Sequence, residues 1–165
     1  MAYIFLSGGL GYQAIADTST TVGEAHPLGT IAQASDSTYG GGEFIYLKGL
    51  AATAIGSWVT YNSDDNTTAL LAANAIGPVA VAMSANVASK YGWYQIGGKA
   101  VGKALASFAD NGLVHATSTA GSIDDAVVAG DRVKLAKGAS AVDTPSAGFA
   151  EFEIHRPFMD DAASA

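Results

Sequence analysis

The feature of this sequence that most constrains its fold is the regular return of turn-forming residues between short stretches that favour β-strands. Turn signals such as Asp110–Gly112 and Gly130–Asp131 recur roughly every 8 to 12 residues, a spacing typical of all-β barrels and sandwiches. No segment carries the sustained 3.6-residue apolar stripe of an amphipathic helix. The sequence therefore predicts an all-β fold, a small β-barrel or sandwich-like domain.

The predicted strands lie between residues 43 and 158, which we take as one β-rich domain. Gly97–Gly98 is interpreted as a hairpin turn, Val133 and Leu135 are expected to share one strand face, and Pro157 is expected to end the last strand. Residues 67–73 fit either a strand or a helical turn, and the alanine-rich stretches 69–75 and 81–88 leave room for one short helix. The expected strands are Phe44–Lys48, Ser57–Tyr61, Pro78–Met83, Tyr91–Ile96, Lys99–Phe108, Leu113–Ala116, Arg132–Ala136 and a segment that contains Phe152 and Ile154.

Residues 1–42 are rich in glycine and follow neither the helical nor the strand period, so we expect an extended N-terminal arm; residues 159–165 form a short tail. A disordered arm is the alternative, but apolar side chains are more frequent here than in typical disordered segments. We therefore expect the arm to dock on a neighbouring subunit by strand addition, and its deletion (residues 1–36) to leave the domain folded but weaken binding. The candidate contact residues are Tyr3, Ile4, Phe5, Leu6, Tyr12, Ile15, Val22, Leu28, Ile31 and Tyr39.

Composition points to a subunit that other surfaces cover. Only 14% of the 165 residues are charged while 49% are hydrophobic, and ordinary soluble domains carry roughly 25% charged residues. The net charge of -7 and the lack of a basic run argue against nucleic-acid binding. We expect no membrane span, no secretory signal and synthesis in the cytoplasm. Without cysteine there is no disulfide and no thiolate metal site.

The motifs that suggest chemistry each fail on inspection, so we expect no catalytic residue, no metal and no cofactor. Gly97–Lys103 matches the start of a phosphate-binding loop, but Ala104 stands where serine or threonine would hold magnesium. A calcium-loop frame that begins at Asp64 has Ala69 in place of glycine and Ala75 in place of the bidentate glutamate. The acidic pairs are interpreted as solvated turns; they are Asp64–Asp65, Asp124–Asp125 and Asp160–Asp161. The three histidines lack metal-ligand spacing; they are His26, His115 and His155.

Aromatic residues gather in the middle of the chain and leave two interpretations open. They could form a carbohydrate-binding platform, but aromatic side chains on strands more often pack in a core or an interface. The residues are Trp58, Tyr61, Tyr91, Trp93 and Tyr94.

Several segments resemble one family of phage structural proteins. The stretches 26–31, 39–49 and 91–102, with the turns at Asp110–Gly112 and 129–133, are similar to the head-decoration, or capsid cement, proteins of tailed phages. The resemblance covers most of residues 26–156 and is one of texture and strand order. It implies a small β-barrel-like homotrimer that binds the major capsid protein on the outer capsid surface of the virion and catalyses no reaction. A phage tail or fibre component and a carbohydrate-binding β-module are the alternatives.

Overall fold

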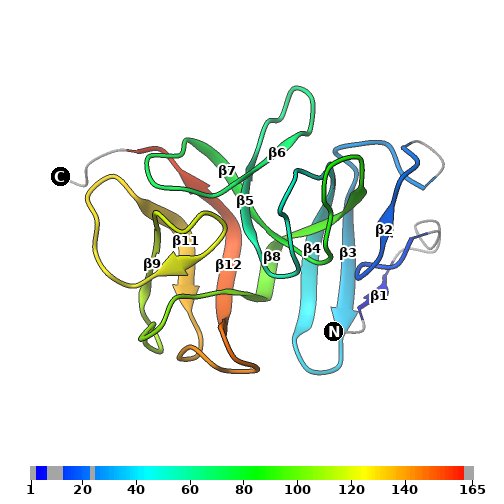
Figure 1. The fold of residues 1–165 in the computed structure, drawn as a ribbon. Coiled ribbons are helices and arrows are strands. Elements are labelled where there is room, and N and C mark those ends of the chain that lie inside the picture. The colour runs from blue at the N-terminus through cyan, green and yellow to red at the C-terminus, as the bar shows by residue number, and fades with distance from the viewer. Residues whose placement is uncertain (1–2, 7–12, 23–24, 162–165) are drawn as a thin grey trace.

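The computed structural model describes residues 3–6, 13–22 and 25–161, and in these residues the fold is all-β (Figure 1). Turn residues and glycines separate twelve strands, and the described part of the chain contains no helix. The strands are β1 (Ile4–Phe5), β2 (Thr18–Ser19), β3 (Ile31–Asp36), β4 (Gly40–Lys48), β5 (Trp58–Tyr61), β6 (Thr68–Leu70), β7 (Gly77–Ala82), β8 (Tyr91–Lys103), β9 (Leu113–Ala116), β10 (Ile123–Asp124), β11 (Arg132–Gly138) and β12 (Phe149–Met159).

The twelve strands form one antiparallel sheet in the order β1-β3-β4-β8-β7-β12-β11-β9-β10, with β2 on β8, β5 on β7, and β6 on β5. Strand β8 is the centre: its first half pairs with β4 and its second half with β12. Strand β7 enters where β8 and β12 diverge and pairs with both. The sheet is not closed into a barrel, although an isolated parallel bridge joins Ala104 to Ile123.

Two breaks expected from the sequence are continuous strand instead. Gly97 and Gly98 lie inside β8 and make no hairpin turn, because the strand continues from its pairing with β4 directly into its pairing with β12. Gly98 has φ +92°, and a Cβ there would lie 2.3 Å from the Gly41 carbonyl oxygen. Glycine in a strand interior marks such close backbone approaches as well as turns. Strand β12 likewise runs through Pro157, where the ladder to β11 is irregular.

The core has three clusters, and strand alternation assigns the side chains to them. Phe44 and Tyr46 of β4 face one cluster with Trp93, while Ile45 and Leu47 face a second, on the opposite side of the strand. The third and largest cluster fills the half of the molecule built from β7, β9, β10, β11 and β12, and includes Phe152. Burying each of these large side chains contributes roughly 1.5–3 kcal/mol.

The expected N-terminal arm is wrong as an independent segment, because its described residues belong to the chain's own sheet. Strand β1 pairs with β3, β2 with β8, and β3 with β4 over six residue pairs. The boundary drawn at residues 42–43 falls inside β4. Tyr3 and Ile15 are buried in the cluster that contains Phe44 and Trp93. The apolar side chains that suggested docking on a neighbour therefore cover, in large part, this chain's own aromatic residues.

Candidate functional site

The ten contact residues expected from the sequence divide into buried and exposed sets. Tyr3 and Ile15 are buried, and Phe5, Leu28 and Tyr39 are half-buried against the same cluster. The exposed members are Ile4, Leu6, Val22 and Ile31, and Tyr12 lies outside the described residues. Only the exposed set remains free to contact a partner.

Three of those exposed side chains share one side of the N-terminal sheet edge. Ile4 of β1 is opposite Ser35, and the next outward residue, Leu6, donates its N–H to the Gln33 carbonyl at 2.9 Å. Ile31 lies further along β3 and alternates with the inward Ala32 and Ala34. An apolar row at a short edge strand is a surface to which another chain can add.

A second exposed apolar surface was missed by the sequence analysis; we call it the apolar end. Its most exposed members are Val127, at 78%, Ile76, at 69%, and Leu135, at 63%, and Val128 and Phe158 complete it. Figure 1 shows the β10–β11 connection and the end of β12 at one end of the molecule, where β7 begins.

Hydrogen bonds and register hold the segments of the apolar end together. The Asn74 N–H donates to the buried Asp131 carboxylate at 2.6 Å, which ties the β6–β7 connection to the start of β11. A Cβ on Gly130 would lie 2.8 Å from Asp161, so the β10–β11 connection lies against the end of the chain beyond β12. Phe158 pairs with Pro78 on one side and Lys134 on the other. The apolar end is therefore a built surface on three neighbouring strands and their connections.

Leu135 does not share a face with Val133, which corrects the sequence expectation. The β11–β12 register jumps between Lys134 and Ala136, where Leu135, with φ +59°, is the single β11 residue opposite three residues of β12. Val133 and Ala136 are buried, and Leu135 faces outward. The extra residues of this irregularity lie on β12, and such an irregularity re-aims nearby side chains on the two strands. The positive φ is uncommon for a bulky residue and costs on the order of 1–2 kcal/mol.

Charged side chains on the central strands pair with one another. Arg156 makes a bidentate pair with Glu43, at 3.0 Å from Nε to Oε2 and 2.7 Å from Nη2 to Oε1. The Arg156 hydrogen bonds hold the pKa of the Glu43 carboxyl below its usual value. The other pairs are Lys99–Glu151, Lys134–Asp160 and Lys137–Glu153. These pairs neutralise much of the charge on β8, β11 and β12, and Lys134–Asp160 borders the apolar end.

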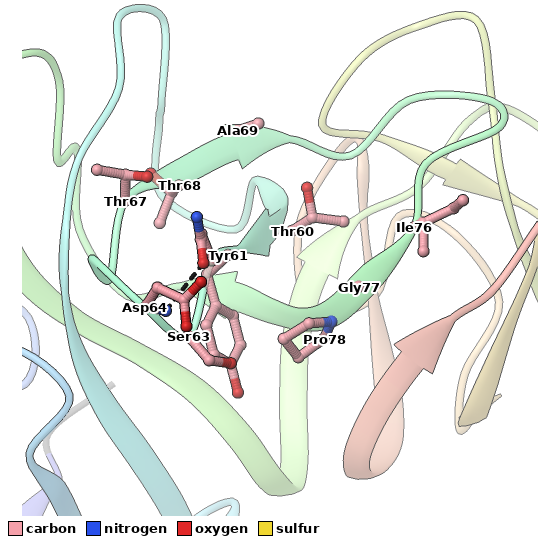
Figure 2. A pocket seen from close by; sticks show the side chains of 11 residues that line it. Thr60, Tyr61, Ser63, Asp64, Thr67, Thr68, Ala69, Ile76, Gly77 and Pro78 are labelled. Atoms are coloured by element: carbon pink, nitrogen blue, oxygen red, sulfur yellow. Dashed lines mark hydrogen bonds between the residues drawn. The ribbon is translucent and has the colours of Figure 1, made fainter.

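The aromatic platform is not assembled, because most of its residues are in the core. Trp58, Trp93 and Tyr94 are fully buried. Tyr61 lines a groove, which has a volume of about 520 Å³ and lies between the β5–β6 hairpin and the start of β7 (Figure 2). We call it the hydroxyl groove; its lining residues are Thr60, Tyr61, Asn62, Ser63, Asp64, Thr67, Thr68, Ala69, Ile76, Gly77 and Pro78.

His26 is buried inside an aromatic cage. Its ring centroid lies 4.9 Å from that of Trp93, 5.3 Å from Tyr46 and 6.5 Å from Phe5. Its Nε2 has no hydrogen-bond partner among the described residues. Burial lowers the pKa of this imidazole below its usual value. The neutral ring is therefore a packing element of the N-terminal half.

The other suspected motifs occupy ordinary structural positions. The Gly97–Lys103 segment is the second half of β8, so it does not form a loop at a helix N-terminus. Asp65 accepts hydrogen bonds from the Thr67 N–H and hydroxyl, which closes the β5–β6 turn. His115 is buried and His155 is exposed. Across residues 3–6, 13–22 and 25–161, no three His, Asp or Glu side chains are grouped so as to hold a metal ion. The same residues include no helix long and apolar enough to cross a membrane.

Comparison with known proteins gives no relative. No protein-family model matches the sequence, no curated protein matches it, and no solved structure matches the fold.

Proposed function

We propose that this protein is a non-enzymatic structural subunit that binds other protein subunits, specifically as a decoration protein on the outer surface of a tailed-phage capsid. The observation that carries the proposal is Leu135, a leucine at positive φ whose side chain is largely exposed. Strained backbone persists where surrounding structure enforces it, and such positions are concentrated at functional sites. In the free subunit most of this side chain is in water, whereas a partner that covers it would bury it.

Burial on a partner would more than offset the strain at this position. The αL backbone costs about 1–2 kcal/mol, while complete burial of a leucine contributes about 1.5–3 kcal/mol. Phe158, Ile76 and Val127 surround the same end and add to the apolar area that a partner could cover. Protein interfaces typically have an apolar centre and a polar rim, and here the ion pair Lys134–Asp160 borders the apolar end.

The choice of a capsid as partner comes from the resemblance of residues 26–156 to capsid cement proteins. On this proposal, the apolar end contacts the major capsid protein or the adjacent copy in a homotrimer. The exposed row of Ile4, Leu6 and Ile31 is the second contact, at a sheet edge suited to strand addition. A protein whose function is interface area needs shape and apolar complementarity, and it needs no reactive constellation.

The test uses the variant Leu135→Asn, because asparagine tolerates the left-handed backbone and removes the apolar side chain. We expect unchanged or higher stability and about tenfold weaker binding, equivalent to about 1.4 kcal/mol, to capsids stripped of this protein. Val87→Asn is the matched control, since Val87 is exposed and lies outside the apolar end. Full binding by Leu135→Asn would refute the interface.

Copy number separates the head from the tail. Protein gels of purified virions should show this protein in amounts comparable to the major capsid protein. A few copies per particle would contradict decoration and favour a tail or fibre component.

A further inference from the structure

The hydroxyl groove carries an inference of its own, which does not depend on the capsid proposal. It opens between the β5–β6 hairpin and the start of β7, and its volume of about 520 Å³ falls within the roughly 300–1,000 Å³ range of small-molecule sites. In Figure 2 the Tyr61 ring lies between the Asp64 side chain and Pro78 in this view. The groove therefore combines an aromatic side chain with a polar turn.

Five of the polar side chains that line this groove have a group without a protein partner in the described part of the chain, whereas the hydroxyls of Thr67 and Thr68 are bonded. Asn62 Oδ1 accepts the Asp64 N–H at 2.8 Å, which fixes the amide and leaves its Nδ2 donors without a bond. The Asp64 carboxylate and the hydroxyls of Thr60, Tyr61 and Ser63 likewise make none of the side-chain hydrogen bonds that the described residues form. Asp65, the next residue along the turn, by contrast accepts hydrogen bonds from both the Thr67 N–H and the Thr67 hydroxyl through its Oδ1. These unbonded donors and acceptors all belong to residues that line the groove.

Apolar surface borders the same space. Tyr61 and Pro78 are half-buried, while Ile76, which also lines the groove, is largely exposed. Burial raises the pKa of the Tyr61 phenol, so its hydroxyl stays a protonated donor at neutral pH. A ligand that fits must present one apolar face and several groups that both donate and accept hydrogen bonds.

We propose that the hydroxyl groove binds a neutral saccharide, with a sugar ring against Tyr61 and its hydroxyls bonded to Asn62 and Asp64. A sugar ring has apolar C–H faces and hydroxyls at its edge, which matches this combination of groups. No lysine or arginine lines the groove, and Asp64 would repel a phosphate or a carboxylate. A single unpaired carboxylate is too few for a divalent cation, which takes six or more oxygen ligands in the case of calcium.

The experiment screens the full-length protein against an array of neutral and sialylated oligosaccharides and then titrates the neutral hits by calorimetry. We expect a neutral oligosaccharide to bind, and Asp64→Ala to weaken binding about tenfold because a charge-assisted hydrogen bond is lost. Tyr61→Phe keeps the aromatic ring and should weaken binding less than Asp64→Ala does. Asp110→Ala is the charge-matched control, since Asp110 is an exposed turn residue outside the groove; it should bind as wild type does.

Three outcomes would overturn the proposal. They are the absence of any sugar binding at millimolar concentration, equal affinity of Asp64→Ala and wild type, and an exclusive preference for sialylated glycans. NMR chemical shifts of residues 60–64, recorded with each hit, show whether the bound sugar occupies this groove; shifts confined to other residues would also refute it. None of these readouts involves capsid binding, so the two proposals fail separately.

Discussion

The buried Gln13 side chain holds the N-terminal segment to the central sheet, and its removal gives the sharpest test of that packing. Its Nε2 donates to the carbonyls of Asp17 and Tyr91, each at 3.0 Å. Its Oε1 accepts the Tyr46 hydroxyl at 2.7 Å. Its backbone carbonyl accepts the Trp93 indole N–H at 3.1 Å. One side chain therefore connects the segment before β2 to β4 and β8.

The cost of Gln13→Ala follows from what the truncation leaves behind. The Tyr46 hydroxyl is buried and would lose its acceptor, which costs about 1–3 kcal/mol for an unsatisfied polar group. Two carbonyls lose a donor, and a cavity replaces the amide, which together add about 1 kcal/mol or more. We expect Gln13→Ala to lower the free energy of unfolding by about 2–4 kcal/mol.

Urea denaturation followed by tryptophan fluorescence measures this loss, since Trp93 is in the same cluster. Gln33→Ala is the control, because Gln33 is exposed on β3, and it should change stability by less than about 0.5 kcal/mol. A double-mutant cycle with Tyr46→Phe should give a coupling of about 1 kcal/mol or more. A loss below about 1 kcal/mol for Gln13→Ala would refute the anchoring role.

Other predictions follow from the same half of the molecule. The pKa of His26 is lowered in the folded state, so the unfolded chain binds the proton more readily. The free energy of unfolding should therefore fall as pH decreases through about 6.5 and stay level above it; urea titrations at several pH values should show a flatter profile for His26→Gln. Gly49→Ala places a Cβ 1.9 Å from the Asn86 carbonyl oxygen and should cost more than about 3 kcal/mol, whereas Gly41→Ala meets nothing within 4 Å and should be near neutral by thermal melting. Deleting residues 1–36 removes β1 to β3 and should abolish the near-UV circular dichroism of the buried aromatic residues, a result opposite to that expected of a free arm.

The sequence predicts the β class of this fold because turn residues and strand-forming stretches are local signals. Strand β12 shows this well: Phe152 and Ile154 are buried and Glu153 is exposed, as alternation requires. Glycine, however, has two uses that a sequence does not distinguish. At Gly97–Gly98 it permits β8 to pass close to β4, and no turn occurs. Only the partner strands decide between these uses.

The N-terminal segment was misjudged because its order is non-local. Strand β2 has two residues, and its partners Gly92 and Tyr91 lie more than 70 positions away. Such short strands carry no detectable period. The list of apolar contact residues was nonetheless informative, since Tyr3 and Ile15 are indeed covered, but by this chain's own sheet.

The apolar end could not be predicted because it depends on one irregularity. Strict strand alternation predicts that Leu135 points inward with Val133, and the neighbouring residues give no sequence signal for a bulge. Val127 and Ile76 lie in connections, where exposed apolar residues have no pattern to mark them. The hydroxyl groove is different, since the Asp64–Asp65 pair in its turn is interpreted from the sequence as a solvated turn, and only the fold brings that turn beside Pro78.

The irregularity between β11 and β12 accounts for two features: the outward position of Leu135 and the ion pair between Arg156 and Glu43. Between the pairs Ala136–Ile154 and Lys134–Phe158, β12 contains three residues and β11 only one. Both Leu135 and Arg156 have positive φ there, at 59° and 48°. The distortion turns Leu135 outward and lets Arg156 reach Glu43 on β4.

The exposed ion pair does not account for that strain. A surface pair contributes about 0–1 kcal/mol, whereas two bulky residues at positive φ cost about 1–2 kcal/mol each. Packing of the buried Pro157 and Met159, which flank the outward Phe158, offsets part of the difference. The remainder is strain that the free subunit carries, and burial of Leu135 and Phe158 against a partner is the contribution that would offset it. This is why the bulge, more than any single exposed side chain, supports assembly as the function of this surface.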